Sequence, residues 1–349
     1  MRTIVAGALA AVLALAAAGS VLAAEPDFVA FHLPWDPHSQ TSLARHIGQI
    51  DIAAPLWVTL RGPNAEVVVE PDPKGAALLA SRKGRPEVYP IVSNAHDDVW
   101  DSASAQAAIL DPATRDAFLG RLARLARARG FGGYIFDLEN LTPATLAGYP
   151  AFLAAAKTAF ASTGVKVWST AAPGSDWPLP ALAEAGDAVV LMAYDACWAT
   201  STPGPVAGQD WLEAVLAQRL NGVDSKKVVI ALGSYGYDWP EGGAGSPIGA
   251  DAAIRLADRT GAKIIRDPVS RDPHFSYTGP DGRRHQVWYV DGRAFALARG
   301  AAASLQPRAI ALWRLGLEDP DLWTASPVRN ARPAPSTGAL PHPCDPLRR

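Results

Sequence analysis

About eight short runs rich in apolar, β-branched and aromatic residues alternate along this chain with amphipathic segments of helical period. The expected strands cover residues 28–35, 52–60, 87–93, 133–139, 165–171, 188–194, 228–234 and 308–313. The expected helices cover residues 41–49, 75–82, 112–129, 143–162, 180–185, 209–222 and 291–303. Because parallel strands are joined by helical crossovers, eight such units in one domain predict an α/β fold, a closed (β/α)8 TIM barrel.

The stretch from about residue 245 to 290 is too long for one connection in such a barrel. It contains a helical pattern at 250–260 and β-like runs at 263–266, 275–278 and 285–290. The last two runs are separated by a segment with Asp-Gly, a hairpin signal. We therefore predict a small α+β insertion after the seventh strand, inside a barrel domain of residues 27–324.

Both ends of the chain differ in composition from the barrel. In residues 1–23, Arg2 precedes an Ala-rich apolar stretch, and Val21-Leu22-Ala23 offers a small-residue cleavage site. This pattern predicts a signal peptide and a secreted or periplasmic protein that has no membrane contact after signal removal. Residues 325–349 are rich in proline and polar residues, which predicts a disordered tail.

Charge and cysteine content narrow the classes of partner. Lys and Arg number 32 and Asp and Glu 34, mixed throughout, with a formal net charge of −2. Nothing in this pattern resembles the basic stripe that nucleic-acid binding requires. His96-Asp97-Asp98 lacks supporting ligand spacing, so we predict no metal site and no cofactor. Cys197 and Cys344, the only cysteines, could form a disulfide in an exported protein, but the sequence does not show that they meet.

The fourth expected strand ends in two acids, in Gly133-Tyr134-Ile135-Phe136-Asp137-Leu138-Glu139-Asn140. Side chains alternate along a strand, so Asp137 and Glu139 share one side with Ile135. A carboxylate pair on a buried strand is costly unless it is used or neutralised. Glycosidases need a proton-donating carboxyl and a second group that handles positive charge on the sugar. On its own, the pair could equally open a polar loop.

In TIM barrels, chemistry lies at the carboxyl ends of the strands. The other strand ends supply carboxylates, an amide and aromatic side chains: Trp35, Asp36, Asn94, Tyr194, Asp195, Tyr235, Tyr237, Trp239 and Trp313. Aromatic surfaces flanked by acids suit sugars, which present apolar faces and hydroxyl edges. The same aromatic residues could also serve as ordinary barrel packing, and Asp195 could cap a loop.

The ordered set of motifs resembles glycoside hydrolase family 18, the chitinase-like barrels. That family carries D-G-x-D-x-D-x-E along strand four, M-x-Y-D after strand six and a tryptophan at the end of strand eight. Here Asp137-Leu138-Glu139 keeps the end of the first motif, Met192-Ala193-Tyr194-Asp195 completes the second, and Trp313 stands at the third. The family's first two acids on strand four are replaced by Gly132 and Ile135.

The wider sequence resembles a bacterial branch of that family, whose domains are often fused between a polysaccharide deacetylase and a glycosyltransferase. Segments that carry this likeness include Pro203-Gly204-Pro205 and Pro273-His274-Phe275-Ser276-Tyr277. The branch resemblance favours a bacterial cell-wall or extracellular polysaccharide as the substrate.

The family resemblance implies substrate-assisted, retaining hydrolysis of a polysaccharide with β-linked N-acetylglucosamine: a chitin-like polymer, peptidoglycan or an exopolysaccharide. Glu139 would be the acid and base, Asp137 would orient the acetamido group, and Tyr194 would hydrogen-bond it. The expected substrate-binding residues are Asp195, Trp313, Trp35, Asp36, Asn94, Tyr235, Tyr237 and Trp239.

Two other functions stay open. Ile135 stands where the family has an acid, so the barrel could bind carbohydrate without cleaving it, as a lectin does. A glycosidase of another specificity could use Asp195 or Asp238 as a nucleophile opposite Glu139, and would form a covalent sugar ester.

Overall fold

A computed structural model of the chain describes residues 25–81, 86–97, 99–325 and Cys344. The predicted signal peptide and nearly all of the predicted tail lie outside these residues. The main sheet contains β1 (Asp27–His32), β2 (Ile52–Pro55), β3 (Val58–Arg61), β4 (Glu66–Val69), β5 (Glu87–Val88), β6 (Ile91–Ser93), β9 (Gly133–Asp137), β10 (Lys166–Ala171), β11 (Ala188–Ala193), β12 (Val228–Gly233) and β18 (Ala309–Trp313). Its order is β4-β3-β6-β9-β10-β11-β12-β18-β1-β2-β5.

Two strands of this curled sheet are interrupted, so each counts as two in the strand order. Leu56 and Trp57 separate β2 from β3, and Tyr89 and Pro90 separate β5 from β6. β2 pairs in parallel with both β1 and β5, while β3 pairs in parallel with β6. If each interrupted strand is counted once, the parallel pairing runs from β1 around through β18 and back to β1. The structure is thus an α/β barrel, the fold class expected from the sequence.

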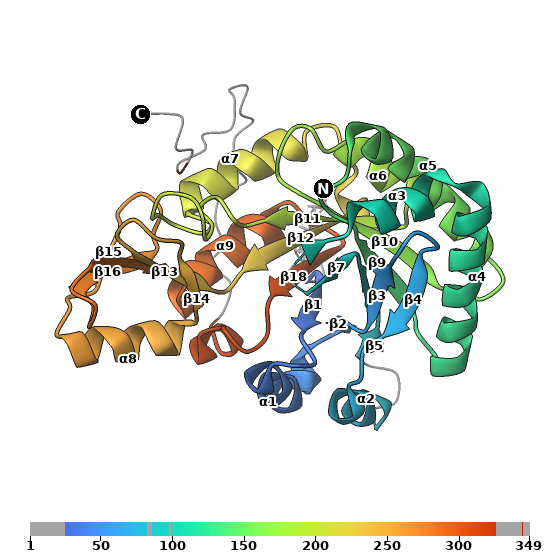
Figure 1. Cartoon of the computed structure of the whole chain (residues 1–349). Coiled ribbons are helices and arrows are strands. Elements are labelled where there is room, and N and C mark those ends of the chain that lie inside the picture. The colour runs from blue at the N-terminus through green and yellow to red at the C-terminus, as the bar shows by residue number, and fades with distance from the viewer. Residues whose placement is uncertain (1–24, 82–85, 98, 326–343, 345–349) are drawn as a thin grey trace, which may run out of the picture.

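Helices cover the outside of this sheet (Figure 1). They are α1 (Pro37–His46), α2 (Pro73–Ala80), α3 (Ser102–Leu110), α4 (Pro112–Arg129), α5 (Pro143–Phe160), α6 (Leu179–Ala185), α7 (Gln209–Arg219) and α9 (Gly292–Ser304), with 3-10 turns at η1 (Ile47–Gln49), η2 (Ser225–Lys227) and η3 (Pro320–Trp323). Four of them begin with a polar cap followed by proline at the first helical position; for α1 these are Asp36 and Pro37. That cap explains why α1 begins four residues before the expected start. None of the described helices has the length and apolar character needed to cross a membrane.

Side chains of the barrel strands alternate between the interior and the layer under the helices. On β9, Tyr134 and Phe136 pack with helix residues in the outer layer, whereas Ile135 lies in the interior cluster. The same alternation on β11 places Val190 and Met192 inside. The two cores therefore share the strands, one on each face.

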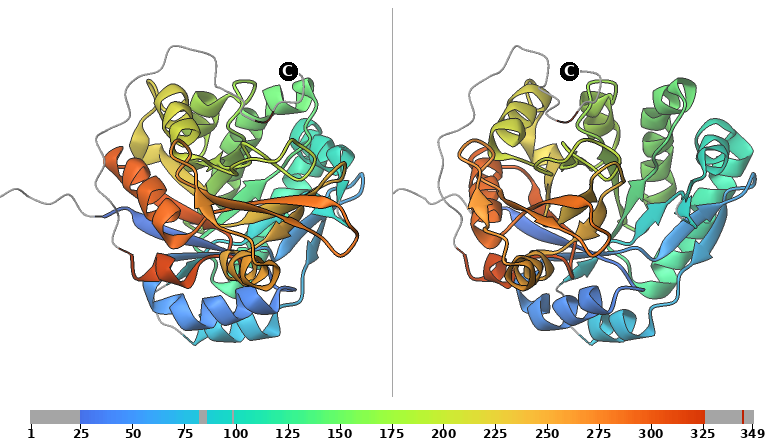
Figure 2. Two further views of the ribbon diagram at one scale, coloured as in Figure 1. Left: turned by 90° about the vertical axis from the view of Figure 1, so that its left-hand side faces the viewer. Right: turned by 60° about the vertical axis from the view of Figure 1, so that its left-hand side comes forward.

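A second, smaller sheet follows β12 in the chain. It contains β13 (Gly236–Pro240), β14 (Ser246–Ile248), β15 (Ile265–Arg266), β16 (Pro273–Thr278) and β17 (Arg284–Tyr289), in the order β14-β13-β17-β16-β15, with helix α8 (Ala250–Thr260). Its strands pair antiparallel, and α8 packs on one face. Figure 1 shows this sheet and α8 at the left of the barrel, near α9, and in Figure 2 the same side is turned toward the viewer.

The sequence did not indicate β13 or α3. Residues 235–239 were expected at the rim as the end of the seventh strand, but Gly236–Pro240 form a strand of the second sheet because β17 pairs with them. Helix α3 consists mainly of alanine and serine, which give no apolar stripe. A short hairpin of β7 (Ala95–His96) and β8 (Val99–Trp100) precedes α3.

Candidate active site

The acid pair lies at the carboxyl end of β9, on the interior side of the barrel. Asp137 is the last residue of the strand and pairs in register with Ser93 of β6. Its side chain is buried, and the Thr170 hydroxyl of β10 donates a hydrogen bond of 2.8 Å to Asp137 Oδ1. Glu139, two residues further, shares the side of Asp137 and of the interior residue Ile135. The alternation expected from the sequence is therefore present.

Burial and mutual repulsion govern the charge of these acids. Burial raises the pKa of Asp137, and the hydrogen bond from Thr170 opposes this only in part. Burial, followed by the negative charges of Asp137 and Asp195, raises the pKa of Glu139 to about 8. None of the described lysines or arginines forms an ion pair with these three acids. Glu139 therefore holds a proton at neutral pH and can donate it.

The residues after β11 lie against this pair. The Tyr194 ring stacks on Trp313, with centroids 6.1 Å apart and an interplanar angle of 10°, and Tyr235 meets Tyr194 edge-on at 6.3 Å. The Tyr235 hydroxyl donates a hydrogen bond to Asp195 Oδ1. Burial, then the charges of Asp137, Asp195 and Glu139, raise the pKa of Tyr194, so its hydroxyl stays a neutral hydrogen-bond donor.

Trp313 closes this group from the end of β18. It pairs in register with Gly233 of β12, and its ring meets Phe31 of β1 edge-on at 5.3 Å. A Cβ at position 233 would come within 3.1 Å of Tyr194 Cβ and 3.2 Å of Tyr235 Cε1. The glycine thus lets both tyrosines approach the strand end. The structure brings together Asp137, Glu139, Tyr194, Asp195, Tyr235 and Trp313.

Several other expected substrate contacts are placed differently. Trp239 is 2% exposed and its Nε1 donates to the Trp198 carbonyl at 3.3 Å, so it offers no open face to a sugar. Tyr237 is also buried, between Tyr235 and Trp239. The sequence predicted that both side chains contact the sugar. Because they lie on β13, they pack instead between the second sheet and the interior of the barrel.

Asp36 and Asn94 are engaged by the protein itself. Asp36 caps α1 by accepting from His38 N at 2.8 Å, and its other carboxylate oxygen pairs with Arg314. Asn94 is fully buried, and its amide binds backbone groups of Glu139 and Asp101. Neither side chain has the free groups that the expected sugar contact requires.

Trp35 is the exposed aromatic residue of the expected set. Its side chain is 63% exposed. It lines a hollow of about 750 Å³ between α1 and the start of α2, together with Gln40, Thr41 and Lys74. An indole with an open face at such a hollow suits stacking on a sugar ring.

The loop that carries Asp195 is anchored by a disulfide between Cys197 and Cys344, which are 147 residues apart in sequence. Both cysteines pack with the interior cluster of the barrel. The sequence left this pairing open. Thr170 is a further residue of the site that sequence reasoning missed, although its inward position on β10, two residues after the buried Trp168, followed from the alternation.

Two other acidic groups lie outside this cluster. Asp238 belongs to β13, where Tyr277 OH donates to its Oδ2 at 2.6 Å and His285 Nδ1 lies 2.8 Å from its Oδ1. These contacts leave no free oxygen for a nucleophile. His96 lies 3.4 Å from Asp97 and 3.6 Å from Asp101, and the described residues contain no group of three or more ligands that could hold a metal ion.

Known proteins similar to this chain carry the names of cortex-lytic enzymes, glycosylases and chitinases. No family model matches the chain. The cortical fragment-lytic enzyme of Bacillus subtilis is 29% identical over 248 residues, which are 67% of this chain and 58% of that protein. The homologues are glycoside hydrolases of the chitinase type. The chain spans less than two thirds of the length of that relative.

Solved structures agree on the fold. A chitinase from Chromobacterium violaceum superimposes with a TM-score of 0.78 at 24% identity, over 86% of this chain and 97% of that one. The Bacillus cereus spore cortex-lytic enzyme SleL gives 0.76 at 20% identity, over 86% of this chain and 73% of that one. This barrel has the chitinase fold.

Proposed function

We propose that this protein is a secreted glycoside hydrolase that cleaves polysaccharides containing β-linked N-acetylglucosamine, with Glu139 as acid and base. The observation that carries the proposal is the pair of buried Asp137 and partly buried Glu139, with no ion-pairing cation among the described residues. Such a pair lowers the stability of the folded protein, and that cost is understandable at a catalytic site.

Substrate assistance accounts for the roles of these residues. Glu139 donates its proton to the glycosidic oxygen as the C–O bond breaks, while the acetamido oxygen of the sugar attacks the anomeric carbon. Ionised Asp137 orients the acetamido N–H and balances the charge of the resulting oxazolinium ion. Glu139 then takes a proton from the water that attacks the anomeric carbon, and the product retains its configuration. The internal nucleophile supplies much of the rate through proximity.

The neutral Tyr194 hydroxyl and the Trp313 ring complete the proposed sugar site. Tyr194 donates a hydrogen bond to the acetamido carbonyl, and Trp313 supplies an apolar floor stacked on the Tyr194 ring. Asp195 accepts hydrogen bonds from sugar hydroxyls with the oxygen that Tyr235 leaves free. Trp35 adds a more distant stacking surface.

Ile135 shapes the proton transfer in this chain. It occupies the inner position where the resembling family has another acid, so Asp137 shares no proton with a deeper carboxyl. Thr170 is instead the hydrogen-bond partner of Asp137. Asp137 therefore acts as a carboxylate fixed by a neutral hydroxyl.

A bacterial cell-wall polymer is the proposed substrate class. Two similar proteins carry names that refer to the spore cortex, the cortical fragment-lytic enzyme and SleL. The signal-like residues 1–23 support export, and the branch resemblance to deacetylase and glycosyltransferase fusions supports a role in polysaccharide metabolism.

The test compares product release from N-acetylated and fully deacetylated glucosamine oligomers by wild type and Glu139→Gln. We expect wild type to cleave only the acetylated oligomers, because only these carry the internal nucleophile, and Glu139→Gln to be inactive. Cleavage that ignores acetylation, or an active Glu139→Gln variant, would contradict the proposal. A covalent sugar ester on Asp195 or Asp238 would instead favour a glycosidase with an enzymic nucleophile.

The second candidate is a carbohydrate-binding barrel without turnover, and the apolar Ile135 is the observation that favours it. Oligosaccharide binding measured by calorimetry, with no product after prolonged incubation across acetylated oligomers and peptidoglycan fragments, would establish it.

A further inference from the structure

The backbone of Glu139 lies beyond the strand pairing of β9. The ladder to β6 ends at Ser93–Asp137, and the ladder to β10 ends at Ser169–Phe136. Asn94 supplies the missing partner: its Oδ1 accepts from Glu139 N, and its Nδ2 donates to Glu139 O, both at 3.0 Å. The side-chain amide thus pairs with Glu139 as a peptide group of a neighbouring strand would.

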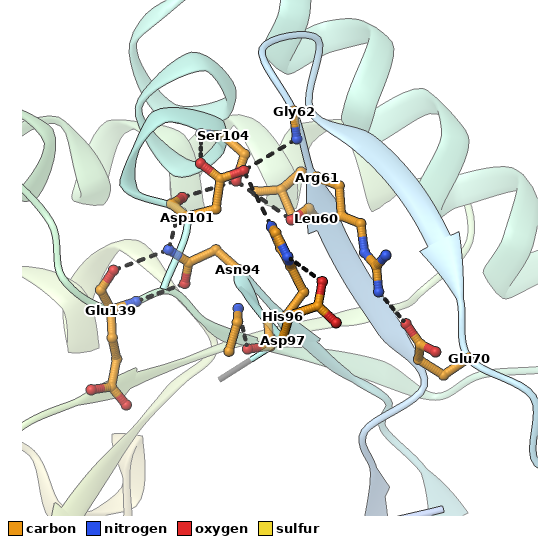
Figure 3. A network of polar contacts seen from close by, with 12 residues as sticks. Leu60, Arg61, Gly62, Glu70, Asn94, His96, Asp97, Asp101, Ser104 and Glu139 are labelled. Atoms are coloured by element: carbon orange, nitrogen blue, oxygen red, sulfur yellow. Dashed lines mark hydrogen bonds and ion pairs between the residues drawn. The ribbon is translucent and has the colours of Figure 1, made fainter. Parts of the chain in front are cut away.

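Asn94 is itself held on two sides. The Asn94 side chain is fully buried, and its Nδ2 also donates to the Asp101 carbonyl at 3.1 Å. The backbone carbonyl of Asn94 accepts a hydrogen bond from Asp101 N at 2.8 Å. The Asp101 carboxylate in turn accepts from Gly62 N at 3.2 Å and from Ser104 N at 3.0 Å. Figure 3 shows this network, which ties Asn94 to the start of α3 and to the turn after β3.

The residue after Glu139 is fixed as well. Asn140 adopts the left-handed conformation, with φ of 53°, so the chain changes direction at this point. The Ser102 hydroxyl, from the first residue of α3, donates to the Asn140 carbonyl at 2.6 Å. Asn94 therefore binds the peptide groups before and after Glu139, and Ser102 binds the peptide group that follows Asn140.

We infer that Asn94 is the positioning residue for Glu139, supported by Ser102, and that it sets the direction of the Glu139 carboxyl rather than contacting the sugar. Figure 3 shows the Glu139 side chain leaving its backbone away from this network. A general acid must lie within hydrogen-bonding distance of the leaving oxygen, and small displacements cost large factors in rate. The kinetic part of this inference rests on the proposed function.

The first test compares Asn94→Ala with Ser104→Ala in the full chain. Ser104 is an equally buried polar residue whose hydroxyl donates to the carbonyls of the same Asp101 and of Leu60 and not to Glu139. We expect Asn94→Ala to lower kcat by about 10- to 100-fold with KM within about threefold, and Ser104→Ala to change neither by more than about threefold. Equal kinetics in wild type and Asn94→Ala would overturn the inference.

Two further variants keep the test decisive if Asn94→Ala does not fold. Asn94→Asp keeps the size of the side chain and one acceptor but cannot donate to Glu139 O, and we expect its kcat to fall by at least about tenfold. Ser102→Ala removes only a peripheral hydroxyl, and we expect a fall of about three- to tenfold. Wild-type kcat in both variants would contradict the inference.

A second readout does not depend on activity. The Glu139 carboxyl can be titrated by ¹³C NMR in glutamate-labelled protein, with Glu139→Gln to assign its signal. Loss of the hydrogen bonds between Asn94 and the Glu139 backbone should expose this carboxyl to water. Its pKa should therefore fall by about one unit or more in Asn94→Ala, but not in Ser104→Ala. An unchanged titration in Asn94→Ala would overturn the inference, while a wild-type protein that cleaves no acetylated oligomer would refute the proposed function alone.

Discussion

Two groups of partly buried acids lie in this protein, one at the end of the barrel and one in the second sheet. In the barrel, Asp137 and Asp195 each accept a hydrogen bond from a neutral hydroxyl, and the Glu139 carboxyl has no hydrogen-bond partner among the described residues. In the second sheet, both oxygens of Asp238 are bound, by Tyr277 and by His285.

This difference distinguishes a candidate catalytic site from a structural contact. A carboxylate bound at both oxygens by a hydroxyl and an imidazole stabilises the strands of the second sheet that it joins. Acids that repel one another in a buried place lower stability, and such groups are found where their proton is used. Residue type alone makes Asp238 and Glu139 look alike at the ends of apolar runs, whereas their partners set them apart.

The sharpest contrast is between Glu139→Gln and Asp238→Asn. We expect Glu139→Gln to lower kcat by about a thousandfold or more, because the amide cannot donate the proton that the proposed acid supplies to the leaving oxygen. Asp238→Asn should change kcat by less than about threefold, since its contacts lie in the second sheet. Initial rates on an N-acetylated oligomer measure kcat for both variants. Comparable losses of kcat in the two variants would contradict the distinction between a catalytic Glu139 and a structural Asp238.

Asp137→Asn should have the next largest effect, with kcat lower by about a hundredfold, because the acetamido group loses its orienting charge. The variant should also change the pH profile. The Asp137 charge contributes to the raised pKa of Glu139, so its removal lowers that pKa, and the loss of activity at high pH should begin at lower pH. A profile with the same high-pH limb as wild type would show that the two acids are not coupled.

Stability should respond in opposite directions in the two groups. Folding raises the pKa of Glu139 to about 8. Between the pKa of Glu139 in the unfolded chain and about 8, the unfolded chain has lost this proton while the folded protein still holds it, so the folded state loses stability as the pH rises. Glu139→Gln should therefore be more stable than wild type by about 1–3 kcal/mol at pH 8 and nearly equal at pH 4. Asp238→Asn should lose about 1–3 kcal/mol at pH 8, because the Asn side chain has one acceptor oxygen where Asp238 uses two.

Urea denaturation at the two pH values measures these differences. A Glu139→Gln variant that is less stable than wild type at pH 8 would mean that the carboxylate has a stabilising partner after all.

The smallest expected effects concern the aromatic residues of the barrel. Trp313→Ala should raise KM by about 10- to 100-fold, since its ring is both the proposed floor and the support of Tyr194. Trp35→Ala should raise KM by less than about tenfold on long oligomers and leave the shortest substrates unaffected, because Trp35 lies at a separate hollow. Equal effects of Trp35→Ala on long and short oligomers would place Trp35 at the cleavage point instead.

The sequence predicted the barrel well because its signals are local. Apolar runs and amphipathic segments recur with regular spacing, and the observed bounds of α4 and α8 agree with the expected ones. The alternation that sends Ile135 and Asp137 inward and Phe136 outward also follows from neighbouring residues. Helix α3 was missed because its alanine-rich sequence lacks a polar and an apolar face.

What the sequence could not provide are contacts between distant segments. β13 is a strand because β17, about fifty residues later, pairs with it, and that pairing buries Trp239. Asn94 was expected to bind substrate because it follows a barrel strand. Only the structure shows that its amide is occupied by the backbone of Glu139, 45 residues away.

We expect Glu139 to be protonated at neutral pH because it lies partly buried beside Asp137 and Asp195, with no cation paired to it in the described part of the chain. Titration of its carboxyl by ¹³C NMR tests this most directly. The account predicts a pKa well above that of an ordinary glutamate, near 8, falling in Asp137→Asn. A Glu139 carboxyl that titrates between about 4 and 5, in wild type and Asp137→Asn alike, would contradict it.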